Sequence, residues 1–433
     1  MLWFFYNILF VFGFLVMLPR FLWRMARRGG YARNFLQRFG RYAPAVRAQL
    51  AGGGRVWVHA VSVGEVGVGL RLIAELRRRR PDLRCLLSTT TSTGYAVALK
   101  QLDAADVLIY FPLDFPLITR RVLGLIKPCA LLLIENELWP NLVRGAVRRG
   151  IPVALINGRI SPHSFRGYRR LKPLTRRLLA GVNLFCAQGA ADARRLIELG
   201  APSERVQVMG SAKYDLVPAG DGGAQQARAV LAAAGFDAAR LLLLGGSTWR
   251  GEEAVLLDTY RRLRDRFPDL ALVLVPRHAE RRAEVLREIE TRGLQAVVRS
   301  RVPSSADAAV VRPDVLLVDT TGELRDFYAV ADVIFVGKSL TQHGGQNIIE
   351  PAQCGKPVLA GPHLENFDSI VPDFLAAHAL VQVRDAAGLT AAIGELLADP
   401  AARRALGERA AGVVRDQAGV IRVTAARLLP LLT

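Results

Sequence analysis

The stretch RVWVHAVSVGEVGVGLRLIAELRRRR, residues 55–80, decides the fold of this chain. It begins with a run of apolar, β-branched residues, which is typical of a strand buried on both faces of a parallel sheet. It then passes through Gly64, Gly67 and Gly69 into an amphipathic pattern with apolar residues three and four apart, which indicates a helix. A strand followed at once by a helix is the repeating unit of an α/β protein.

The same alternation continues along the chain in two series. Because 433 residues are too many for one ordinary core, we predict two domains, each a doubly wound, Rossmann-like parallel sheet with helices on both faces. Strands are predicted at 55–63, 84–91, 106–113, 129–138, 151–161, 182–189 and 206–215, and then at 240–248, 271–278, 295–300, 314–322, 331–339, 356–362 and 379–383. The expected segments are an anchor at 1–22, a first domain at 23–214, a breaker-rich linker at 215–226 and a second domain at 227–433. The pattern leaves open whether the last helix returns to the first domain.

Composition restricts the class of protein further. The chain is 51% hydrophobic with 39 Gly and 22 Pro, which is globular usage and excludes a disordered or fibrous protein. The formal net charge of +20 indicates an anionic partner: nucleic acid, a membrane surface or a phosphorylated substrate. Nucleic acid is disfavoured, because aromatic residues are not interleaved with the basic ones as stacking platforms. The cysteines fit neither a metal spacing nor a disulfide scaffold, so we interpret them as reduced thiols of a cytoplasmic protein: Cys85, Cys129, Cys186 and Cys354.

Residues 1–18 form an uncharged apolar segment with one interruption, Asn7. The segment is long enough to cross or deeply enter a bilayer, and it lacks the basic leader and small-residue cleavage site of a secretory signal. Positive charge follows it, which by the positive-inside bias keeps the rest of the chain in the cytoplasm. The basic residues are Arg20, Arg24, Arg27, Arg28, Arg33, Arg38, Arg41 and Arg47. We therefore expect a single-pass or monotopic anchor in the inner membrane, held against its anionic surface. The alternative is a buried core helix.

In the second domain, glycines and polar residues fall where predicted strands end and helices begin. Ligands of parallel sheets collect at this edge, so we expect a site in a cleft between the domains. Backbone N–H groups at such turns bind phosphate without a metal, and a carboxylate one turn into a helix accepts from ribose hydroxyls. The candidate nucleotide-binding residues are Gly246, Ser247, Thr248, Arg277, His278, Gly322, Glu323, Leu324, Gly344, Gly345, Asn347 and Glu350, with Ser211 and Lys213 from the end of the first domain. Neither a Walker motif nor a Rossmann G-x-G-x-x-G is present, which argues against an ATPase and a dehydrogenase.

The first domain carries carboxylates at its strand ends. Glu65 comes directly after the first strand, where a helix N-terminus keeps it ionised, and it is either a general base or simply an acid in a first helical turn. Glu135 and Glu137 follow a very apolar strand, where an unpaired carboxylate is costly. If both belong to the strand they point to opposite faces, so we expect only one of them to face the site.

These motifs resemble a known family over almost the whole chain. The resemblance rests on HAVSVGEV (59–66), STTTSTG (88–94), YFPLDFP (110–116), ENELWPN (135–141), INGRIS (156–161), GSAKYD (210–215), GGSTWRGEE (245–253), VPRHAERR (275–282), GELRDFYAVADVIFVGKSL (322–340) and GGQNIIEPAQCGKPVLAGP (344–362). In this order, after an apolar N-terminal segment, they are similar to the 3-deoxy-D-manno-octulosonic acid (Kdo) transferases of lipopolysaccharide biosynthesis. Lys338 is a departure, since we expect a small, glycine-like residue before the following Ser-Leu.

The resemblance implies a GT-B glycosyltransferase fold with an acceptor domain followed by a nucleotide-sugar domain. It implies transfer of Kdo from CMP-Kdo to the lipid A precursor (lipid IVA), with inversion, no metal and no other cofactor. It assigns the general base to Glu65. Because Kdo has a carboxylate of its own, Arg159 is a candidate cation for it. The alternative is another GT-B envelope enzyme with a UDP-sugar donor.

Overall fold

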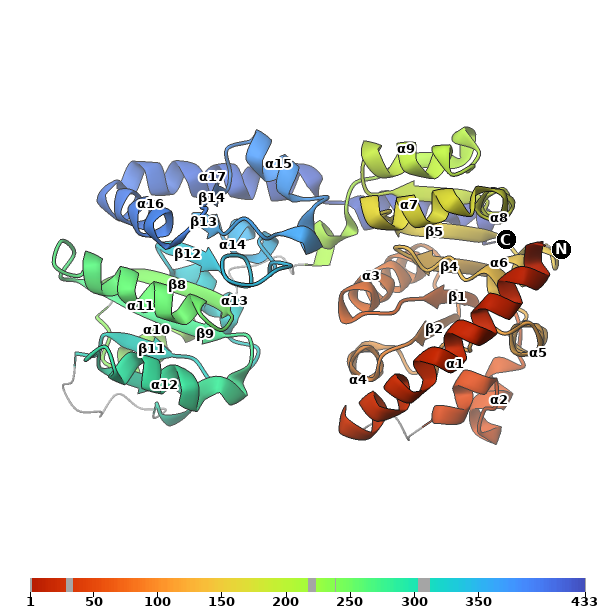
Figure 1. Ribbon diagram of the computed structural model, residues 1–433, viewed down its shortest axis with the longest axis horizontal. Helices are drawn as coiled ribbons and strands as arrows, with labels where there is room; N and C mark the ends of the chain where they lie inside the picture. Colours follow the sequence, from red (N-terminus) through yellow and green to blue (C-terminus); the bar gives the residue numbers. More distant parts are fainter. Residues whose placement is uncertain (1, 29–33, 217–222, 238, 303–311, 433) are drawn as a thin grey trace. The chain divides into compact units, whose positions relative to one another are not determined.

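The computed structural model describes residues 2–28, 34–216, 223–237, 239–302 and 312–432. It separates into two compact units (Figure 1): unit 1 is Met1–Leu216 with Gly419–Thr433, and unit 2 is Val217–Ala418. Of the expected linker, residues 217–222 lie outside the described residues. The last segment of the chain belongs to unit 1, so the last helix does return to the first unit, which is one of the two possibilities left open by the sequence, and unit 2 ends at Ala418.

Unit 1 is built on a parallel sheet of seven described strands in the order β3-β2-β1-β4-β5-β6-β7. The strands are β1 (Val56–His59), β2 (Cys85–Thr89), β3 (Val107–Tyr110), β4 (Ala130–Ile134), β5 (Val153–Gly158), β6 (Leu184–Ala187) and β7 (Val206–Val208). Strands β1, β2, β4, β5 and β6 are fully buried, as is typical of a sheet covered on both faces, whereas β7 has partly and fully exposed residues. It lies at the edge of the sheet, where only one neighbouring strand covers it.

Helices cover both faces of this sheet. They are α2 (Pro44–Leu50), α3 (Val63–Arg79), α4 (Ser92–Gln101), α5 (Pro116–Ile126), α6 (Pro140–Val147), α7 (Pro162–Arg170), α8 (Lys172–Leu179), α9 (Ala190–Glu198) and α18 (Val420–Leu428), with 3-10 turns η1 (Phe35–Phe39), η2 (Ser203–Arg205), η3 (Ala212–Leu216) and η7 (Leu429–Leu431). The alternation of the strand residues divides the core into two clusters, with Trp57 in one and Val58 in the other. Helix α18 packs against α3 and buries Ile421 and Ala425 in the cluster of Val58.

Unit 2 has the same architecture, with the strand order β10-β11-β9-β8-β12-β13-β14 among its described residues. Its strands are β8 (Leu241–Thr248), β9 (Leu270–Pro276), β10 (Ala296–Val298), β11 (Val315–Leu317), β12 (Val333–Val336), β13 (Val358–Ala360) and β14 (Val381–Gln382). Its helices are α10 (Ala224–Ala233), α11 (Glu252–Leu263), α12 (Arg282–Glu290), α13 (Leu324–Val330), α14 (Ile349–Gln353), α15 (Val371–Ala376), α16 (Ala386–Ala398) and α17 (Pro400–Gln417), with turns η4 (Ala279–Arg281), η5 (Arg299–Arg301) and η6 (Glu365–Phe367). Because α10 begins at Ala224, the end of the predicted linker is helical.

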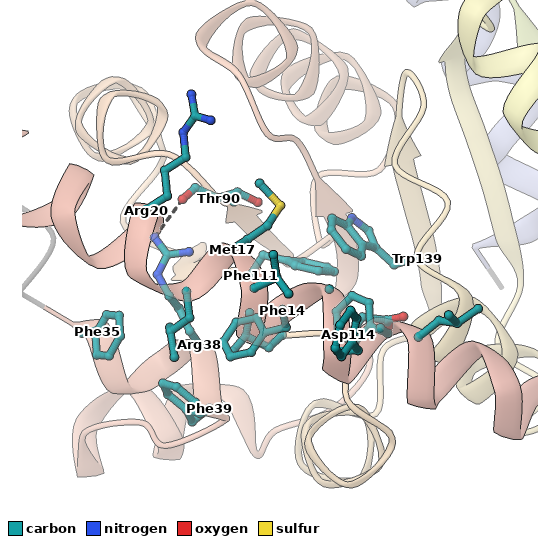
Figure 2. A pocket seen from close by; sticks show the side chains of 17 residues that line it. Phe14, Met17, Arg20, Phe35, Arg38, Phe39, Thr90, Phe111, Asp114 and Trp139 are labelled. Carbon is teal, nitrogen blue, oxygen red and sulfur yellow. Dashed lines mark hydrogen bonds between the residues drawn. The ribbon is translucent and has the colours of Figure 1, made fainter.

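The N-terminal helix α1 (Leu2–Arg28) is longer than the predicted anchor and lies along unit 1 (Figure 1). The Tyr6 hydroxyl donates to Asp114 Oδ2 at 3.1 Å, and Asn7 Oδ1 accepts from Asn141 Nδ2 at 2.8 Å. The ring of Phe14 meets that of Phe115 edge to face at 5.3 Å. Figure 2 shows Phe14 among the side chains of unit 1 that this helix covers. The interruption at Asn7 is thus a docking contact.

Most of the large apolar side chains of α1 are exposed. They are Phe4, Phe5, Ile8, Leu9, Val11, Phe12, Leu15, Val16, Met17 and Trp23. Among the described residues α1 is the one helix whose length and composition would let it cross a membrane, over Trp3–Arg20. Of the basic residues expected after the anchor, Arg33 lies outside the described residues, and the side chains of Arg24, Arg27 and Arg28 are not described either.

Candidate functional site

Glu65 lies in the first turn of α3, at the carboxyl end of β1. Its Oε2 accepts from the Val61 amide at 2.8 Å and its Oε1 from the Ser62 amide at 3.2 Å, while Ser62 Oγ accepts from the Glu65 amide. This is a complete capping box, so Glu65 does cap its helix. A carboxylate has about four lone-pair sites, so each oxygen retains one to accept a further proton. The helix-cap interpretation and the general-base interpretation are therefore compatible.

Glu135 and Glu137 both approach Glu65, which corrects the expectation that they point to opposite faces. Strand β4 ends at Ile134, and Glu135 has a φ of 61°, in the left-handed region. The strand alternation therefore no longer applies to either residue. The negative charge of Glu65 contributes to raising the pKa of both carboxyls, which places the three groups within electrostatic reach of one another.

Burial sets the protonation of these two carboxyls. Desolvation is the main cause that raises the pKa of Glu137 to about 7, with a further contribution from Glu65. The indole N–H of Trp139 donates to Glu137 Oε2 at 2.8 Å and partly opposes this rise. The pKa of Glu135 is also raised by burial, against the opposing charges of Lys213 and Arg159. Lys213 Nζ lies 3.9 Å from Glu135 Oε1.

Ser211 and Lys213 belong to unit 1, in agreement with their place in the predicted first domain, and their contact with the nucleotide stays a prediction. Ser211 is buried, and its Oγ accepts from the Lys213 amide at 3.4 Å. Burial lowers the pKa of Lys213 and the nearby Glu135 raises it. Lys213 and Arg159 are thus the cations of the carboxylate cluster, which we define as Glu65, Glu135 and Glu137.

Two residues beside the carboxylate cluster were not among the site residues predicted from the sequence. His59 is fully buried at the end of β1, its Nδ1 lies 3.2 Å from the Ser88 carbonyl oxygen, and its Nε2 lies 3.9 Å from Glu137 Oε2. Burial lowers the pKa of His59 to about 3, so the imidazole is neutral. Asn157 has a φ of 55°. Its Nδ2 donates a hydrogen bond to Glu135 Oε1 at 3.5 Å, and its Oδ1 accepts one from the Ala212 amide. The signal that could have identified both residues is that each is a polar residue near the end of an otherwise apolar strand.

In unit 2, part of the predicted nucleotide site is taken up by packing. A Cβ on Gly246 would collide with the hydroxyl of Tyr328, and Thr248 is fully buried, with its hydroxyl donating to Glu253 Oε1 at 2.9 Å. Ser247, with a φ of 52°, remains partly exposed between them. Of this turn, Ser247 is the side chain placed to meet a ligand.

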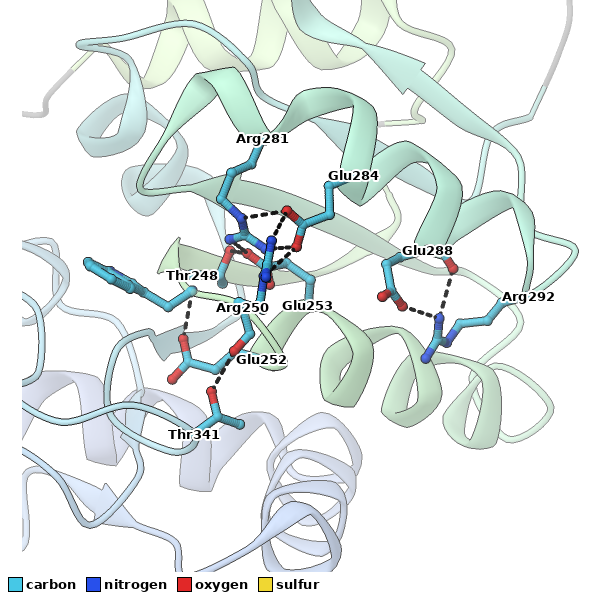
Figure 3. Close-up of polar contacts among 10 residues, drawn as sticks. Thr248, Arg250, Glu252, Glu253, Arg281, Glu284, Glu288, Arg292 and Thr341 are labelled. Carbon is cyan, nitrogen blue, oxygen red and sulfur yellow. Dashed lines mark hydrogen bonds and ion pairs between the residues drawn. The ribbon is translucent and has the colours of Figure 1, made fainter.

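The neighbouring loop is held by the buried carboxylate of Glu252, which is labelled in Figure 3. Its oxygens accept hydrogen bonds of 2.7–3.0 Å from the backbone amides of Trp249, Lys338, Ser339 and Leu340. Lys338 has a φ of 57°, so the backbone takes the left-handed path that favours glycine although a lysine stands there. This is the physical reason for expecting a glycine-like residue at 338.

Arg277 and Glu350 are brought together. Glu350 lies in the first turn of α14, and its Oε1 accepts a hydrogen bond from Asn347 Nδ2 at 2.9 Å. Burial raises the pKa of Glu350, and the positive charge of Arg277 is among the causes that oppose this rise. Arg277 itself is exposed. His278 is exposed too and meets the Trp249 ring edge to face at 5.2 Å. These side chains place a cation and a carboxyl group at the same edge of the sheet.

The remaining candidates form two turns. Gly322, with a φ of 96°, and Leu324 flank Glu323, whose Oε1 accepts from Arg299 Nη2 at 2.8 Å. Gly344 and Gly345 both have positive φ, and the Gly344 amide donates to Glu365 Oε2 at 2.7 Å.

Beside this second turn lie two histidines. The Glu365 carboxylate also meets His343 Nδ1 at 3.0 Å and His363 Nδ1 at 3.5 Å. Among the described residues, these three are a group whose spacing would suit a metal ion.

The fold and the polar strand ends define the class of protein, which comparison with known proteins bears out. Residues 254–413 match the family "Glycosyl transferases group 1". The chain is also similar to the solved structure of a UDP-GlcNAc 2-epimerase from Neisseria meningitidis bound to UDP-GlcNAc, with a TM-score of 0.56. The match covers 86% of this chain and 99% of the epimerase chain. Because the sequence identity is 16%, this similarity shows the fold alone. The chain is a glycosyltransferase of the GT-B type, as predicted.

The family to which the chain belongs is shown by a family match and by relatives of higher sequence identity. Residues 33–216 match the family "3-Deoxy-D-manno-octulosonic-acid transferase (kdotransferase)". A 3-deoxy-D-manno-octulosonic acid transferase of Bordetella pertussis is 37% identical over 414 residues, 93% of each chain. One of Haemophilus influenzae is 31% identical over 405 residues, covering 93% of this chain and 91% of its own. The chain belongs to the Kdo transferase family, which confirms the resemblance.

Proposed function

We propose that this Kdo transferase moves Kdo from CMP-Kdo to the lipid A precursor lipid IVA, with inversion at the anomeric carbon and without a metal. The observation that carries the proposal is the carboxylate cluster of unit 1, in which Glu65, Glu135 and Glu137 lie within electrostatic reach of one another at the end of a sheet.

Glu65 is the proposed general base. The acceptor hydroxyl gives its proton to the Glu65 carboxylate while its oxygen attacks the anomeric carbon of Kdo, and the bond from that carbon to the phosphate oxygen of CMP breaks. Glu137, whose pKa is raised to about 7, is a second group beside Glu65 that can hold or release a proton near neutral pH. Lys213 and Arg159 supply positive charge for the carboxylate of Kdo or for the acceptor.

The donor side is proposed to lie in unit 2. CMP leaves as an anion, so it needs positive charge and N–H donors rather than an acid. Arg277 supplies a cation, and Glu350, in the first turn of α14, can accept from ribose hydroxyls. One phosphate matches this modest number of basic groups, which favours CMP over a UDP donor.

Membrane attachment is proposed to run through α1. Tyr6 and Asn7 dock the helix on unit 1 while its other side exposes a row of apolar residues. This arrangement favours a monotopic helix lying in the cytoplasmic face of the inner membrane over a free spanning helix.

The test is to incubate the purified protein with CMP-Kdo and tetra-acylated lipid A precursor and to measure the product mass. We expect a mass increase of one or more Kdo residues, inhibition by CMP and not by UDP, and full activity after EDTA treatment. Absence of a Kdo adduct, or a product obtained only with a UDP-sugar, would overturn the proposal. Loss of activity with EDTA and recovery with a divalent cation would contradict the metal-free part and direct attention to His343, His363 and Glu365.

A further inference from the structure

A cavity of about 650 Å³ lies between α1 and the body of unit 1 (Figure 2). Its size is within the range of sites that hold small molecules. Most of the described residues that line it are apolar, with Phe14 and Met17 from α1 facing Phe39, Phe111 and Trp139 from unit 1. The polar lining residues are Arg20, Arg38, Thr90 and Asp114, two cations and one carboxyl group among them. An apolar cavity of this size selects a hydrocarbon ligand.

Two aromatic side chains that line the cavity also contact Glu137 of the carboxylate cluster or the neighbouring His59. The indole of Trp139 donates to Glu137, and the ring of Phe111 stacks on the imidazole of His59 with centroids 3.8 Å apart. The Phe111 and Trp139 rings are 5.2 Å apart. A ligand seated in the cavity would therefore be separated from the cluster by a single layer of aromatic rings.

Positive charge accompanies the apolar lining. Arg20 and Arg38 both line the cavity, and Figure 2 shows them on the same side of it. Arg38 is held in place, with Nη2 donating to the Thr90 carbonyl at 2.8 Å and its guanidinium over the Tyr110 ring. Arg20 is exposed. Cations beside a hydrocarbon cavity complement an anionic lipid better than a neutral one.

We propose that this cavity receives one acyl chain of the phosphorylated lipid acceptor and so positions the acceptor sugar at the carboxylate cluster. The inference rests on the proposed function and adds to it a cause of acyl-chain preference. Four exposed apolar residues of α1 also line the cavity, so an acyl chain can reach it along an apolar surface; they are Leu9, Phe12, Val16 and Met17.

The chain itself offers a variant that fills the cavity. Gly13 lines it within α1, and a Cβ built there meets no atom within 4 Å. In Gly13→Leu the side chain would occupy the space of the ligand, and leucine favours a helix more than glycine does, so the variant should fold. Gly124 of α5 is a matched control, because it is exposed, has equally open space at its Cβ and does not line the cavity.

The measurement is the ratio of kcat/KM for tetra-acylated over deacylated acceptor. We expect Gly13→Leu to lower this ratio at least about tenfold, since excluding even two methylene groups from an apolar site costs that much affinity. Gly124→Leu should leave the ratio unchanged. Equal ratios for parent and Gly13→Leu would overturn the proposal.

A second readout does not depend on turnover. An acceptor with a photoactivatable diazirine at the end of one acyl chain should crosslink to peptides carrying Phe14, Met17, Phe111 or Trp139 in the parent and in Gly124→Leu, and should lose these crosslinks in Gly13→Leu. Crosslinks confined to the exposed residues of α1 that do not line the cavity would mean that the chain stays in the bilayer and would overturn the assignment; these residues are Phe4, Phe5, Ile8, Val11, Leu15 and Trp23. If the parent crosslinks as expected but transfers no Kdo, the proposed function fails while the lipid site stands.

Discussion

At the scale of single residues, Glu65 carries two tasks that are usually separate. Its carboxylate caps α3 and, as we propose, also takes a proton from the acceptor. A cap needs an acceptor at the helix N-terminus, whereas a base also needs a negative charge. An amide in place of the carboxylate keeps an oxygen for the cap and removes the basicity, so the two tasks can be tested apart.

We expect Glu65→Gln to lower kcat for transfer by at least about 10²-fold, because general-base catalysis contributes that much. The variant should fold and bind CMP with unchanged Kd, since the donor side is proposed to lie in unit 2. Glu75→Gln on the same helix, which removes an ion pair with Arg78 and Arg79, is the matched control and should retain activity. Turnover by Glu65→Gln at the parental rate would rule out the base assignment.

The raised pKa of Glu137 has a consequence for stability. Its value of about 7 in the folded state lies above the ordinary 4.5, so the folded state holds a proton that the unfolded state has already lost. The free energy of unfolding should therefore fall as pH rises from about 4.5 to 7, by an amount on the order of 3 kcal/mol.

Glu137→Gln should reduce the fall by this amount, and urea unfolding of unit 1 at pH 5 and pH 8 would measure it. A fall should remain in the variant, because burial raises the pKa of Asp114 in the same unit to about 7 as well. Glu75→Gln is again the control, because the pKa of Glu75 is lowered to about 2 by Arg78 and Arg79 and the group does not titrate in this window. A parental slope in Glu137→Gln would show that Glu137 is already ionised at pH 5.

At the scale of elements, buried ion pairs hold the strand-end turns of unit 2 in place. Glu253 of α11 is 2% exposed and accepts from Arg281 at 2.7 Å, while Arg281 also contacts Glu284 of α12 (Figure 3). Removing one partner of such a pair leaves an uncompensated buried charge. The pair therefore ties β8, through Thr248, to the two helices that follow it.

We expect Arg281→Met to lower the free energy of unfolding of unit 2 by about 2–4 kcal/mol, measured by urea unfolding. Glu253→Gln added to it should recover part of the loss, because the buried charge is then gone. Arg250→Met, which removes an exposed partner of the same Glu284, should leave stability unchanged. No recovery in the double variant would mean that packing, and not the buried charge, causes the loss.

The elements are also where the sequence was most informative. Every strand predicted from an apolar run is present, because a buried parallel strand needs a continuous apolar run and the run is visible locally. The turn at Glu135 was not predictable, because its left-handed φ depends on neighbouring strands and not on the residue type. At position 338 a lysine stands where a glycine-like residue is expected. The backbone still takes the left-handed conformation there, because Glu252 accepts hydrogen bonds from the amides of Lys338 and Ser339.

At the scale of the whole molecule, the chain returns to its first unit after completing the second. Helix α18 buries Ile421 in the core of unit 1, and the Asp215 carboxylate accepts the amides of Gly419 and Ile421 at 2.6 Å each. The C-terminal segment is therefore part of the stability of the N-terminal unit.

We expect Ile421→Ala to lower the free energy of unfolding of unit 1 by about 2–4 kcal/mol, as for other large-to-small changes in a core. Val423→Ala on the same helix, where the side chain is 46% exposed, should change it by less than about 0.5 kcal/mol. Limited proteolysis reports both, since cleavage in Ile421→Ala should increase within unit 1 and not within unit 2. Faster cleavage confined to unit 2 would contradict the division of the chain.

The sequence by itself determined the order of strands and helices, the two parallel sheets and the position of Glu65 in a strand-to-helix turn. These depend on the period of apolar residues and on local caps, which short stretches of chain contain. Only the tertiary structure decided that His59, Glu135, Glu137 and Lys213 gather near Glu65, that α18 packs on α3, and that α1 encloses a cavity. Each of these joins residues far apart in the chain, so it follows from which strand ends and helix faces become neighbours and not from any local pattern.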